Sequence, residues 1–251
     1  MVLWLDEGHD AAVNMTRDAA LLERARHGAT DVILRLFTFS PPGITLGHAQ
    51  DPARELDLER LRANGVTWAV RPTGGRAIWH DEEWTFSLVT PLNPEGWAPT
   101  PSLAYERTAR LLADALQDLG VPARLAPGHP RGVGSPRARE GAAPPCFAST
   151  ARHELVIEDR KLAGIAQRTS QGVLLQQGSL LLGPSHARLA EYLALPAEDR
   201  VRLAATMRDG AAEAGPWLGT RTALAHLADA IAMHLPGVER LTAHEGGVRF
   251  R

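Results

Sequence analysis

The sequence has the strand and helix patterns of an α+β protein. Short segments in which apolar residues alternate with polar ones are typical of half-buried strands, and longer segments repeat apolar residues at helical spacing. The chain has 251 residues, of which 44% are hydrophobic and 22% are charged, an ordinary composition for a globular enzyme. This length is enough to bury a substantial core, either in one large domain or in two small ones.

The first half of the chain alternates predicted helices with predicted strands. Residues 10–27 repeat apolar side chains at helical spacing and are followed by Gly28, a common helix terminator. A second helix is expected over residues 51–64, because Asp51 and Pro52 form a typical helix start. Strands are expected at residues 31–39, 44–48, 66–71 and 83–89.

The second half combines helices with an irregular segment and a β-meander. Residues 100–119 keep helical spacing, whereas residues 122–145 are rich in proline, glycine, alanine and arginine and are expected to be irregular. The strands of the meander are expected at residues 155–158, 161–167 and 173–182. From residue 185 the chain is expected to be helical, at residues 186–195, 197–209 and 220–235.

The bulk properties argue against several classes of protein. A formal net charge of −2 is unlike the basic excess of nucleic-acid-binding proteins. No apolar segment approaches the ~20 residues that span a bilayer, and no signal peptide opens the chain, so no membrane partner is expected. One cysteine excludes an internal disulfide and a cysteine-rich zinc site, and no cluster of His, Asp and Glu suggests a metal. We therefore expect a cytoplasmic protein.

The most distinctive segment is residues 71–81, which read Arg-Pro-Thr-Gly-Gly-Arg-Ala-Ile-Trp-His-Asp. Gly74 and Gly75 lack a Cβ, so a ligand can lie directly against their peptide groups. Arg71 and Arg76 flank the glycine pair and are suited to bind a carboxylate, a phosphate or a carbonyl oxygen. Taken alone, the segment fits a hairpin turn with two solvated arginines equally well.

Two later segments contain further candidates. Cys146 follows two prolines at the end of the arginine-rich segment, where nearby cations would favour the reactive thiolate. A lone cysteine is more often buried and inert, which is the alternative. Lys161 opens the sequence Lys-Leu-Ala-Gly-Ile-Ala-Gln-Arg, and by itself would be a turn lysine in water.

These three segments, in this order, resemble the biotin/lipoate protein ligase family. Within it they look most like the cysteine-dependent octanoyltransferases that start lipoate assembly. The resemblance covers residues 14–182 and includes Leu46, Gly47 and Gln50, which match a Leu-Gly…Gln pattern of the family. It also includes a Cys-Phe pair ahead of Glu-Leu-Val at residues 154–156.

The resemblance implies a single α+β domain over residues 1–251, with a mixed, largely antiparallel sheet flanked by helices, as in class II aminoacyl-tRNA synthetases. It implies transfer of an octanoyl group from acyl carrier protein to a lysine of a lipoyl domain or of the glycine-cleavage H protein. Cys146 would carry the acyl group as a thioester, and Lys161 would stabilise the oxyanion. Amide formation from a thioester is downhill, so no cofactor is expected.

The resemblance also implies which residues contact the substrate. They are Arg71, Thr73, Gly74, Gly75, Arg76, His80, Gly164, Gln167, Gly178 and Ser179. Gln177 departs from the family, because the transferases commonly have a histidine there. His80 is at least as well explained as a hydrogen-bonded structural histidine. The base that deprotonates Cys146 stays open among His80, His153 and Lys161.

The expected strand at residues 83–89 is a candidate wall of the acyl pocket. Its apolar side, with Trp84, Phe86 and Leu88, suits an acyl chain, although plain core packing explains the same alternation. The arginine-rich segment is a candidate docking surface for an acidic carrier protein, the alternative being a solvated loop. The arginines concerned are Arg131, Arg137 and Arg139.

Two other functions are compatible with the same family fold. ATP-dependent lipoate–protein ligases favour a third small residue after the glycine pair, where this chain has Arg76, and they need no cysteine at position 146. A non-catalytic acyl-binding module would keep the groove without the covalent step. Exposure to an octanoyl thioester of the carrier protein separates these functions, because only the transferase forms an adduct on Cys146.

Overall fold

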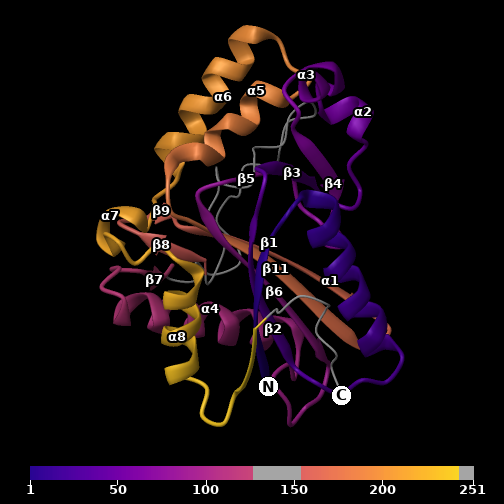
Figure 1. The fold of residues 1–251 in the computed structure, drawn as a ribbon, viewed down its shortest axis with the longest axis vertical. Coiled ribbons are helices and arrows are strands. Elements are labelled where there is room, and N and C mark those ends of the chain that lie inside the picture. Colours follow the sequence, from indigo (N-terminus) through magenta and orange to yellow (C-terminus); the bar gives the residue numbers. More distant parts are fainter. Residues whose placement is uncertain (127–153, 243–251) are drawn as a thin grey trace, which may run out of the picture.

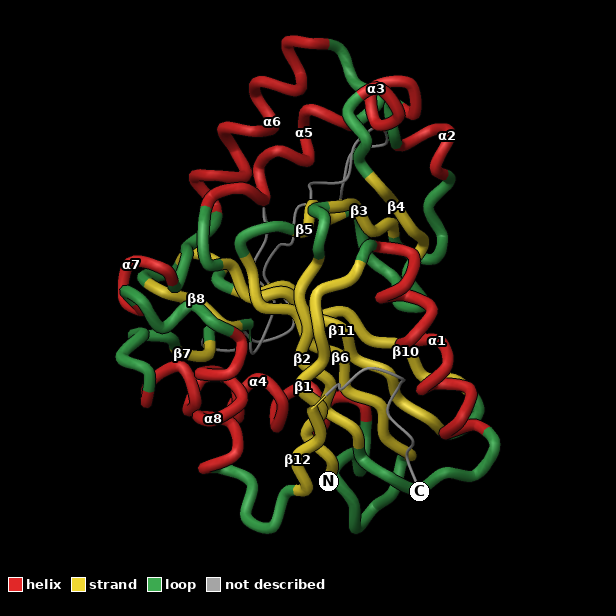
Figure 2. The backbone as a smooth tube through the Cα atoms, viewed as in Figure 1, coloured by secondary structure: helices red, strands yellow, loops and turns green. Residues whose placement is uncertain are grey.

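The computed structural model describes residues 1–126 and 154–242. A mixed six-stranded sheet runs through its centre (Figures 1 and 2). Its strands are β1 (Val2–His9), β2 (Ile33–Phe39), β6 (Glu83–Pro91), β10 (Ala163–Ser170), β11 (Val173–Leu181) and β12 (Glu239–Thr242). They follow the order β10-β11-β6-β2-β1-β12. The first three neighbouring pairs in this order are antiparallel and the last two are parallel, which confirms the predicted mixed, largely antiparallel sheet.

Helices cover both faces of this sheet. Helix α1 (Ala11–Arg26) lies against one face, and α4 (Pro101–Asp118) and α8 (Leu224–Met233) lie on the other (Figure 1). The apolar side of β6 packs into the core beneath α4 and α8. The idea that this apolar side serves an acyl chain is therefore wrong, and core packing explains the alternation. The more polar side of β6 faces α1.

A smaller sheet covers the end of the large one where β2 and β6 meet the connecting loops. It consists of β3 (Gly43–Leu46), β4 (Thr67–Val70) and β5 (Ile78–His80), in the order β4-β3-β5. Its outer layer is α2 (Pro52–Glu55), α3 (Leu58–Ala63), the 3₁₀ helix η1 (Pro184–Arg188), α5 (Leu189–Tyr192) and α6 (Ala197–Gly210). Trp79 is buried between these layers and stacks on Tyr192, with ring centroids 5.3 Å apart.

A third sheet continues the chain beyond α4. It consists of β7 (Arg124–Leu125), β8 (Leu155–Ile157) and β9 (Arg160–Lys161), and α7 (Gly215–Leu218) follows α6. The turn between β8 and β9 has positive φ angles at Glu158 and Asp159, and the turn between β10 and β11 has them at Gln171 and Gly172. The turn between β10 and β11 falls where the sequence predicted it, whereas the turn between β8 and β9 lies one residue before the predicted turn at residues 159–160.

Several elements differ from the sequence-based expectation. Strands β1 and β12 were not predicted, although β1 pairs with both β2 and β12. The single helix expected over residues 51–64 is two helices, because the Asp57 carboxylate accepts a hydrogen bond from the Arg60 amide and starts a new helix. Trp68 and Val70 share a face of β4 as predicted, but that face is partly open to solvent.

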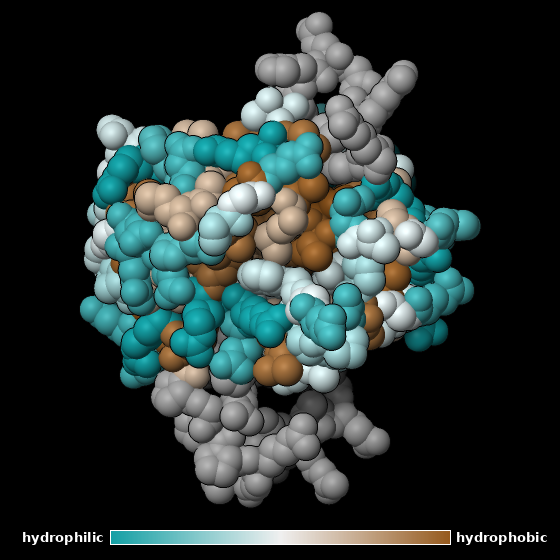
Figure 3. All heavy atoms as spheres, turned by 90° about the horizontal axis from the view of Figure 1, so that it is seen from below, coloured by the Kyte–Doolittle hydropathy of each residue, from teal (hydrophilic) through white to brown (hydrophobic). Residues whose placement is uncertain are grey.

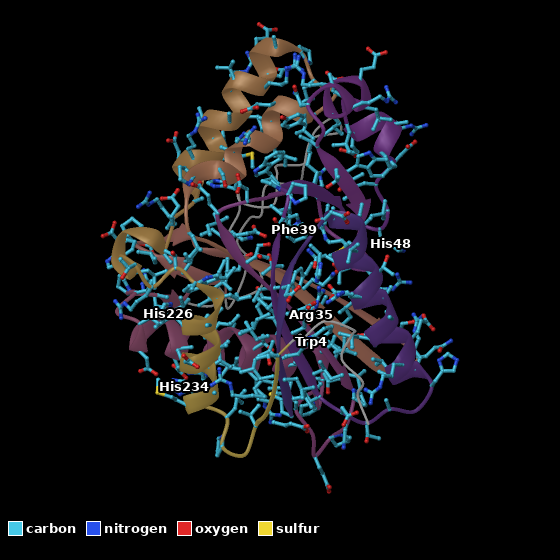
Figure 4. All side chains as sticks on the ribbon, viewed as in Figure 1. Trp4, Arg35, Phe39, His48, His226 and His234 are labelled. Carbon is cyan, nitrogen blue, oxygen red and sulfur yellow. The ribbon has the colours of Figure 1, made fainter. Side chains whose placement is uncertain are left out.

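A buried cluster of charges joins α1 to the sheet. The Arg35 side chain is 0% exposed, and it donates to Asp6 at 2.8 Å and to Asp18 at 2.7 Å. It also donates to the Asn14 side chain at 2.6 Å. Its guanidinium lies 5.3 Å from the ring centre of Trp4, and the two side chains are neighbours in Figure 4. Every strong donor of this arginine thus meets an acceptor or a π face.

Asp6 illustrates the electrostatics of this cluster. Burial alone would raise the pKa of Asp6, but the hydrogen bond from Arg17 and the charge of Arg35 outweigh burial and lower the pKa below 3.8. A carboxyl with a lowered folded-state pKa stabilises the fold above its ordinary pKa. That contribution is lost as the pH falls through the folded-state pKa.

The outer surface is mixed in character. Seen from below, hydrophilic residues cover much of the described surface, and apolar residues are exposed in small groups between them (Figure 3). Among the described residues, no helix is both long enough and apolar enough to cross a membrane.

Arg35→Leu should destabilise the protein by about 3–5 kcal/mol, because it leaves the buried Asp18 without its arginine and removes one of the two arginines that pair with Asp6. Urea unfolding measures the change. Arg110→Leu is the matched control, since Arg110 is 62% exposed and pairs with Glu106 on the same helix. The control should change the unfolding free energy by less than about 1 kcal/mol. Equal effects of the two substitutions would contradict the central role of Arg35.

Candidate active site

A partly open cavity of about 110 Å³ lies between the large sheet, the small sheet and α1. One row of residues across four paired strands forms its floor. In this row Phe37 of β2 pairs with Thr85 of β6, Thr85 pairs with Ser179 of β11, and Ser179 pairs with Gly164 of β10. Because side chains alternate between the faces of a sheet, all four residues present the same face to the cavity.

The walls of the cavity are mostly apolar. Met15, Phe39, Ile78 and Ile165 provide hydrocarbon and aromatic surface around the floor. The remaining lining residues are Thr45, Arg71, Gly75, His80, Lys161, Ala166, Gln177 and Gly178. A mostly apolar cavity with a few polar groups at defined positions is suited to bind an alkyl chain that carries a reactive carbonyl.

Gln177 closes the cavity on the side of α1. Its side-chain amide donates to Asp18 at 2.6 Å and lies 3.4 Å from the sulfur of Met15, and its oxygen accepts from Thr73 at 2.7 Å. Gln177 thus links the glycine loop to the Arg35 cluster. These bonds hold the side chain as a fixed wall, which gives a structural role to the residue that departs from the family pattern.

The glycine loop is held by Arg71 from within. The buried Arg71 guanidinium donates to the carbonyl oxygens of Gly74 and Arg76, each at 2.8 Å, and to that of Thr45 at 3.2 Å. Gly75 lines the cavity with φ at +97°, a conformation that favours glycine. Arg71 therefore organises the loop through its backbone carbonyls.

The Leu-Gly…Gln segment supports the same loop from outside. A Cβ on Gly47 would lie 2.0 Å from the carbonyl oxygen of Gly75, so only glycine allows the two segments to touch. The Gly47 amide donates to the Gln50 side chain, and the His48 amide donates to the Thr73 carbonyl oxygen, both at 3.0 Å. These contacts give a physical reason for Gly47 and Gln50, two of the three residues that sequence matching alone singled out.

Lys161 enters the cavity from β9. Its side chain is 8% exposed, and its ammonium donates to the Glu154 carboxylate at 2.7 Å. Among the 27 lysine and arginine residues of the chain, Lys161 is the only lysine. A chain that otherwise uses arginine throughout keeps the compact ammonium at this one buried position.

Burial and the nearby charge of Glu154 also raise the pKa of Tyr105, so Tyr105 stays neutral there.

His80 is fixed at both ring nitrogens. Nδ1 lies 2.6 Å from Oε1 of Glu83 and Nε2 lies 2.6 Å from the Thr45 hydroxyl. An ionised carboxylate can only accept, so Nδ1 carries the proton. The ring stacks on Phe39 with centroids 3.9 Å apart. This arrangement fits a hydrogen-bonded structural histidine better than a free catalytic base.

The predicted substrate-contacting residues divide into two groups. Arg71, Gly75, His80, Gly164, Gly178 and Ser179 line the cavity, whereas Thr73, Gly74, Arg76 and Gln167 are not among its lining residues. Arg76 is 40% exposed with its guanidinium 3.9 Å from Glu55, and Gln167 accepts from Gln176 on the opposite face of the sheet. Gly178 is required for packing as well, because a Cβ there would lie 2.4 Å from the Phe86 ring.

Other predictions lie outside the described residues. They concern Cys146, His153, Arg131, Arg137 and Arg139. Within the described part of the chain, no three His, Cys, Asp or Glu residues are grouped to hold a metal ion.

Known proteins are similar in sequence to this chain over most of its length. The lipoyl protein ligase A/B catalytic domain family matches residues 10–235. The chain belongs to this family. Octanoyltransferase LipM of Symbiobacterium thermophilum is 35% identical over 253 residues, which cover 98% of this chain and 89% of that protein. Octanoyltransferase LipM of Moorella thermoacetica is 38% identical over 199 residues, which cover 77% and 70% respectively.

Solved structures of this family share the fold. A bipartite lipoate protein ligase of Thermoplasma acidophilum superposes with a TM-score of 0.70 at 20% identity, over 97% of this chain and 87% of that one. A crystal structure of lipoate-protein ligase A bound with ATP gives a TM-score of 0.68 at 20% identity, over 97% and 89%. The predicted lipoate ligase fold is confirmed.

Glu83, Thr45 and Met15 were not predicted as cavity or site residues. Glu83 is the first residue of β6, and its carboxylate accepts from His80, Thr85 and Ser179. The sequence offered one indication that Glu83 belongs to the site: its carboxylate alternates with Thr85 and Ser87 in the strand that directly follows the glycine segment. Thr45 and Met15 had none, because only the tertiary structure brings them to the cavity.

Gly47→Ala should lower acyl loading by about 100-fold, because the added methyl forces the glycine loop to move by an ångström or more. Gly74→Ala is the matched control, since a Cβ there meets no atom within 4 Å. The control should load at a rate near wild type. Both rates come from mass spectrometry of the protein after mixing with an octanoyl thioester. A tolerated Gly47→Ala would show that loop position does not govern loading.

Proposed function

We propose that this chain is an octanoyltransferase of lipoate biosynthesis. The observation that carries the proposal is the position of Lys161, the chain's only lysine. It lines a mostly apolar cavity whose floor includes Gly164 and Ser179. The LipM relatives, which are named octanoyltransferases, support the same function over up to 98% of the chain. The donor is the octanoyl thioester of acyl carrier protein, and the acceptor is a lysine of a lipoyl domain or of the H protein.

The cavity accounts for recognition of the acyl chain. Met15, Phe37, Phe39 and Ile165 replace water around the hydrocarbon, and each buried methylene contributes about 0.8 kcal/mol. The carbonyl of the acyl group lies at the Lys161 end. Gln177 closes the other end. It pairs with Ala166, which lies five residues after Lys161 in the chain and so away from the carbonyl. The wall at Gln177 therefore limits the length of the chain that enters.

The reaction has two acyl transfers through Cys146. In the first, the Cys146 thiolate attacks the carbonyl carbon of the donor thioester, and the carrier thiolate leaves. In the second, the acceptor amine attacks the same carbon, a C–N bond forms, and the bond to the Cys146 sulfur breaks. The proton released by the nitrogen returns to the Cys146 thiolate. Lys161 donates to the carbonyl oxygen in both steps, where negative charge develops.

Glu154 positions the lysine for this role. Its carboxylate accepts from the ammonium at 2.7 Å, which orients the Lys161 side chain in the cavity that it lines. The ammonium is thereby directed before substrate arrives. Such preorganisation avoids the reorganisation that water would require.

The rival function is an ATP-dependent ligase, which shares this fold with the ligase of known structure. A ligase needs ATP and does not depend on Cys146, whereas the transferase needs Cys146 and no nucleotide. The LipM relatives favour the transferase.

Cys146→Ser should lower octanoyl transfer by at least ~100-fold, because the hydroxyl stays protonated and attacks a thioester poorly. This corresponds to at least ~2.7 kcal/mol in the barrier. Wild-type protein should gain one octanoyl group without ATP, and hydroxylamine should release it. Since the chain has one cysteine, the released adduct identifies Cys146. Full activity of the variant with free lipoate and ATP would establish the ligase instead.

Lys161→Ala should slow both transfers by ~10²–10³-fold, because both pass through an oxyanion at the same carbonyl. Lys161→Arg keeps the charge but changes its shape and reach, and it should recover little of the activity. Single-turnover rates for loading and for transfer to the acceptor measure the two steps separately. A variant that loads normally and fails only in transfer would contradict the shared role.

A further inference from the structure

A second hollow lies against the wall of the acyl cavity. It has a volume of about 420 Å³, and Phe39, Trp84 and Leu182 form apolar parts of its lining. Asp81, Glu82 and Glu83 contribute carboxylates to the same lining. Phe39 lines both cavities, so the two spaces are neighbours.

Glu83 has one crowded oxygen and one unused oxygen. Its Oε1 accepts three hydrogen bonds, from His80 and Thr85 at 2.6 Å and from Ser179 at 3.0 Å. Its Oε2 is buried and has no hydrogen-bond partner in the part of the chain that the structure describes. The whole side chain is 1% exposed. A buried carboxylate oxygen without a donor is costly, so the arrangement is complete only when a donor or cation arrives.

We propose that this hollow receives the side chain of the acceptor lysine and that Glu83 takes the proton from its ammonium. The inference rests on the proposed octanoyl transfer and names the site of its second substrate. A lysine side chain is an apolar stem that ends in a cation. The hollow offers aromatic and aliphatic walls for the stem and is lined by three acidic residues, one of which, Glu83, carries the Oε2 that no described donor meets.

The position of Glu83 connects the two substrates. Thr85 and Ser179, which hold Oε1, are part of the acyl-cavity floor. Glu83 therefore stands in the wall between the acyl group and the hollow. An amine held at Oε2 lies beside the acyl cavity and need not displace the acyl chain.

The proton balance of this step is simple. The acceptor arrives as R–NH₃⁺, and transfer of one proton to Oε2 leaves a neutral amine and a neutral Glu83. The amine then forms the C–N bond as described above, and its second proton goes to the departing Cys146 thiolate. Glu83 afterwards loses its proton to solvent. An ammonium cannot attack, because its nitrogen has no lone pair, so this deprotonation must precede the attack.

Other charged groups face the same region and enter its pH dependence. His80 on β5 bonds directly to Glu83, and Asp81 and Glu82 precede it in the turn. Arg71 and Lys161 line the acyl cavity on the other side. All five stay in place when Glu83 alone is replaced by glutamine, so that substitution isolates the carboxylate.

Glu83→Gln tests the proposal with the full chain. Each protein is first loaded with octanoate, and transfer is then measured in a single turnover to N-acetyl-lysine methylamide between pH 7 and pH 10. Loading should be unchanged, whereas transfer at pH 7 should fall by at least ~100-fold, the usual effect of a lost general base. The variant's rate should rise about tenfold per pH unit towards the ordinary lysine pKa of ~10.4, because the variant uses only the free amine. The wild-type rate should depend far less on pH.

Controls and contrary outcomes are defined for each step. Glu213→Gln removes a half-buried carboxylate that lines neither cavity, and it should leave both steps unchanged. A wild-type transfer rate that itself rises tenfold per pH unit would overturn the proposal, even if Glu83→Gln failed to fold. Slower loading with normal transfer would assign the hollow to the donor and would also overturn it. Failure of the wild type to load at all would refute the octanoyltransferase function instead.

Discussion

The Arg35 ion cluster is the interaction on which the rest of the structure depends. Arg35 lies at the centre of the large sheet, and its bonds to Asp6 and Asp18 fix β1 and α1 to β2. Asp18 continues the network to Ser87 on β6 and to Gln177 on β11. Removal of one charge would leave the others buried without compensation, which is why such clusters tolerate little change. The network thereby sets where α1 sits above the sheet.

The acyl cavity inherits its shape from this arrangement. Met15 projects from α1 into the cavity, and Gln177 joins the ion cluster to Thr73 of the glycine loop. A polar network that is fully hydrogen-bonded resists deformation more than an apolar wall does, because any displacement leaves buried groups unpaired. The cavity is thus bounded by a rigid end at Gln177 and by the reactive Lys161 at the other. The proposed mechanism thus assigns chain-length selection to Gln177 on β11 and oxyanion stabilisation to Lys161 on β9.

Two carboxylates divide the electrostatic roles near the carbonyl. Glu154 pairs with the Lys161 ammonium, and in the proposed mechanism it positions that ammonium to stabilise the oxyanion. Glu83 instead receives neutral donors and His80 on one oxygen and leaves the other unused. Different partners give two residues of one type different chemistry, as environments commonly do in active sites. The proposal for the acceptor lysine follows from this difference.

Sequence alone determined the family, the glycine loop and most element positions. Motifs such as residues 71–81, turns at Gln171-Gly172 and the N-cap at Thr100 are local, because backbone torsions and capping bonds involve neighbours in the chain. Only the tertiary structure decided which face of β6 meets the substrate, since alternation separates two faces without saying what covers each. It also decided that Arg71 holds its own loop and that Glu83, which lines the second hollow, bonds to Thr85 and Ser179 of the acyl-cavity floor. The chain order does not reveal these partners.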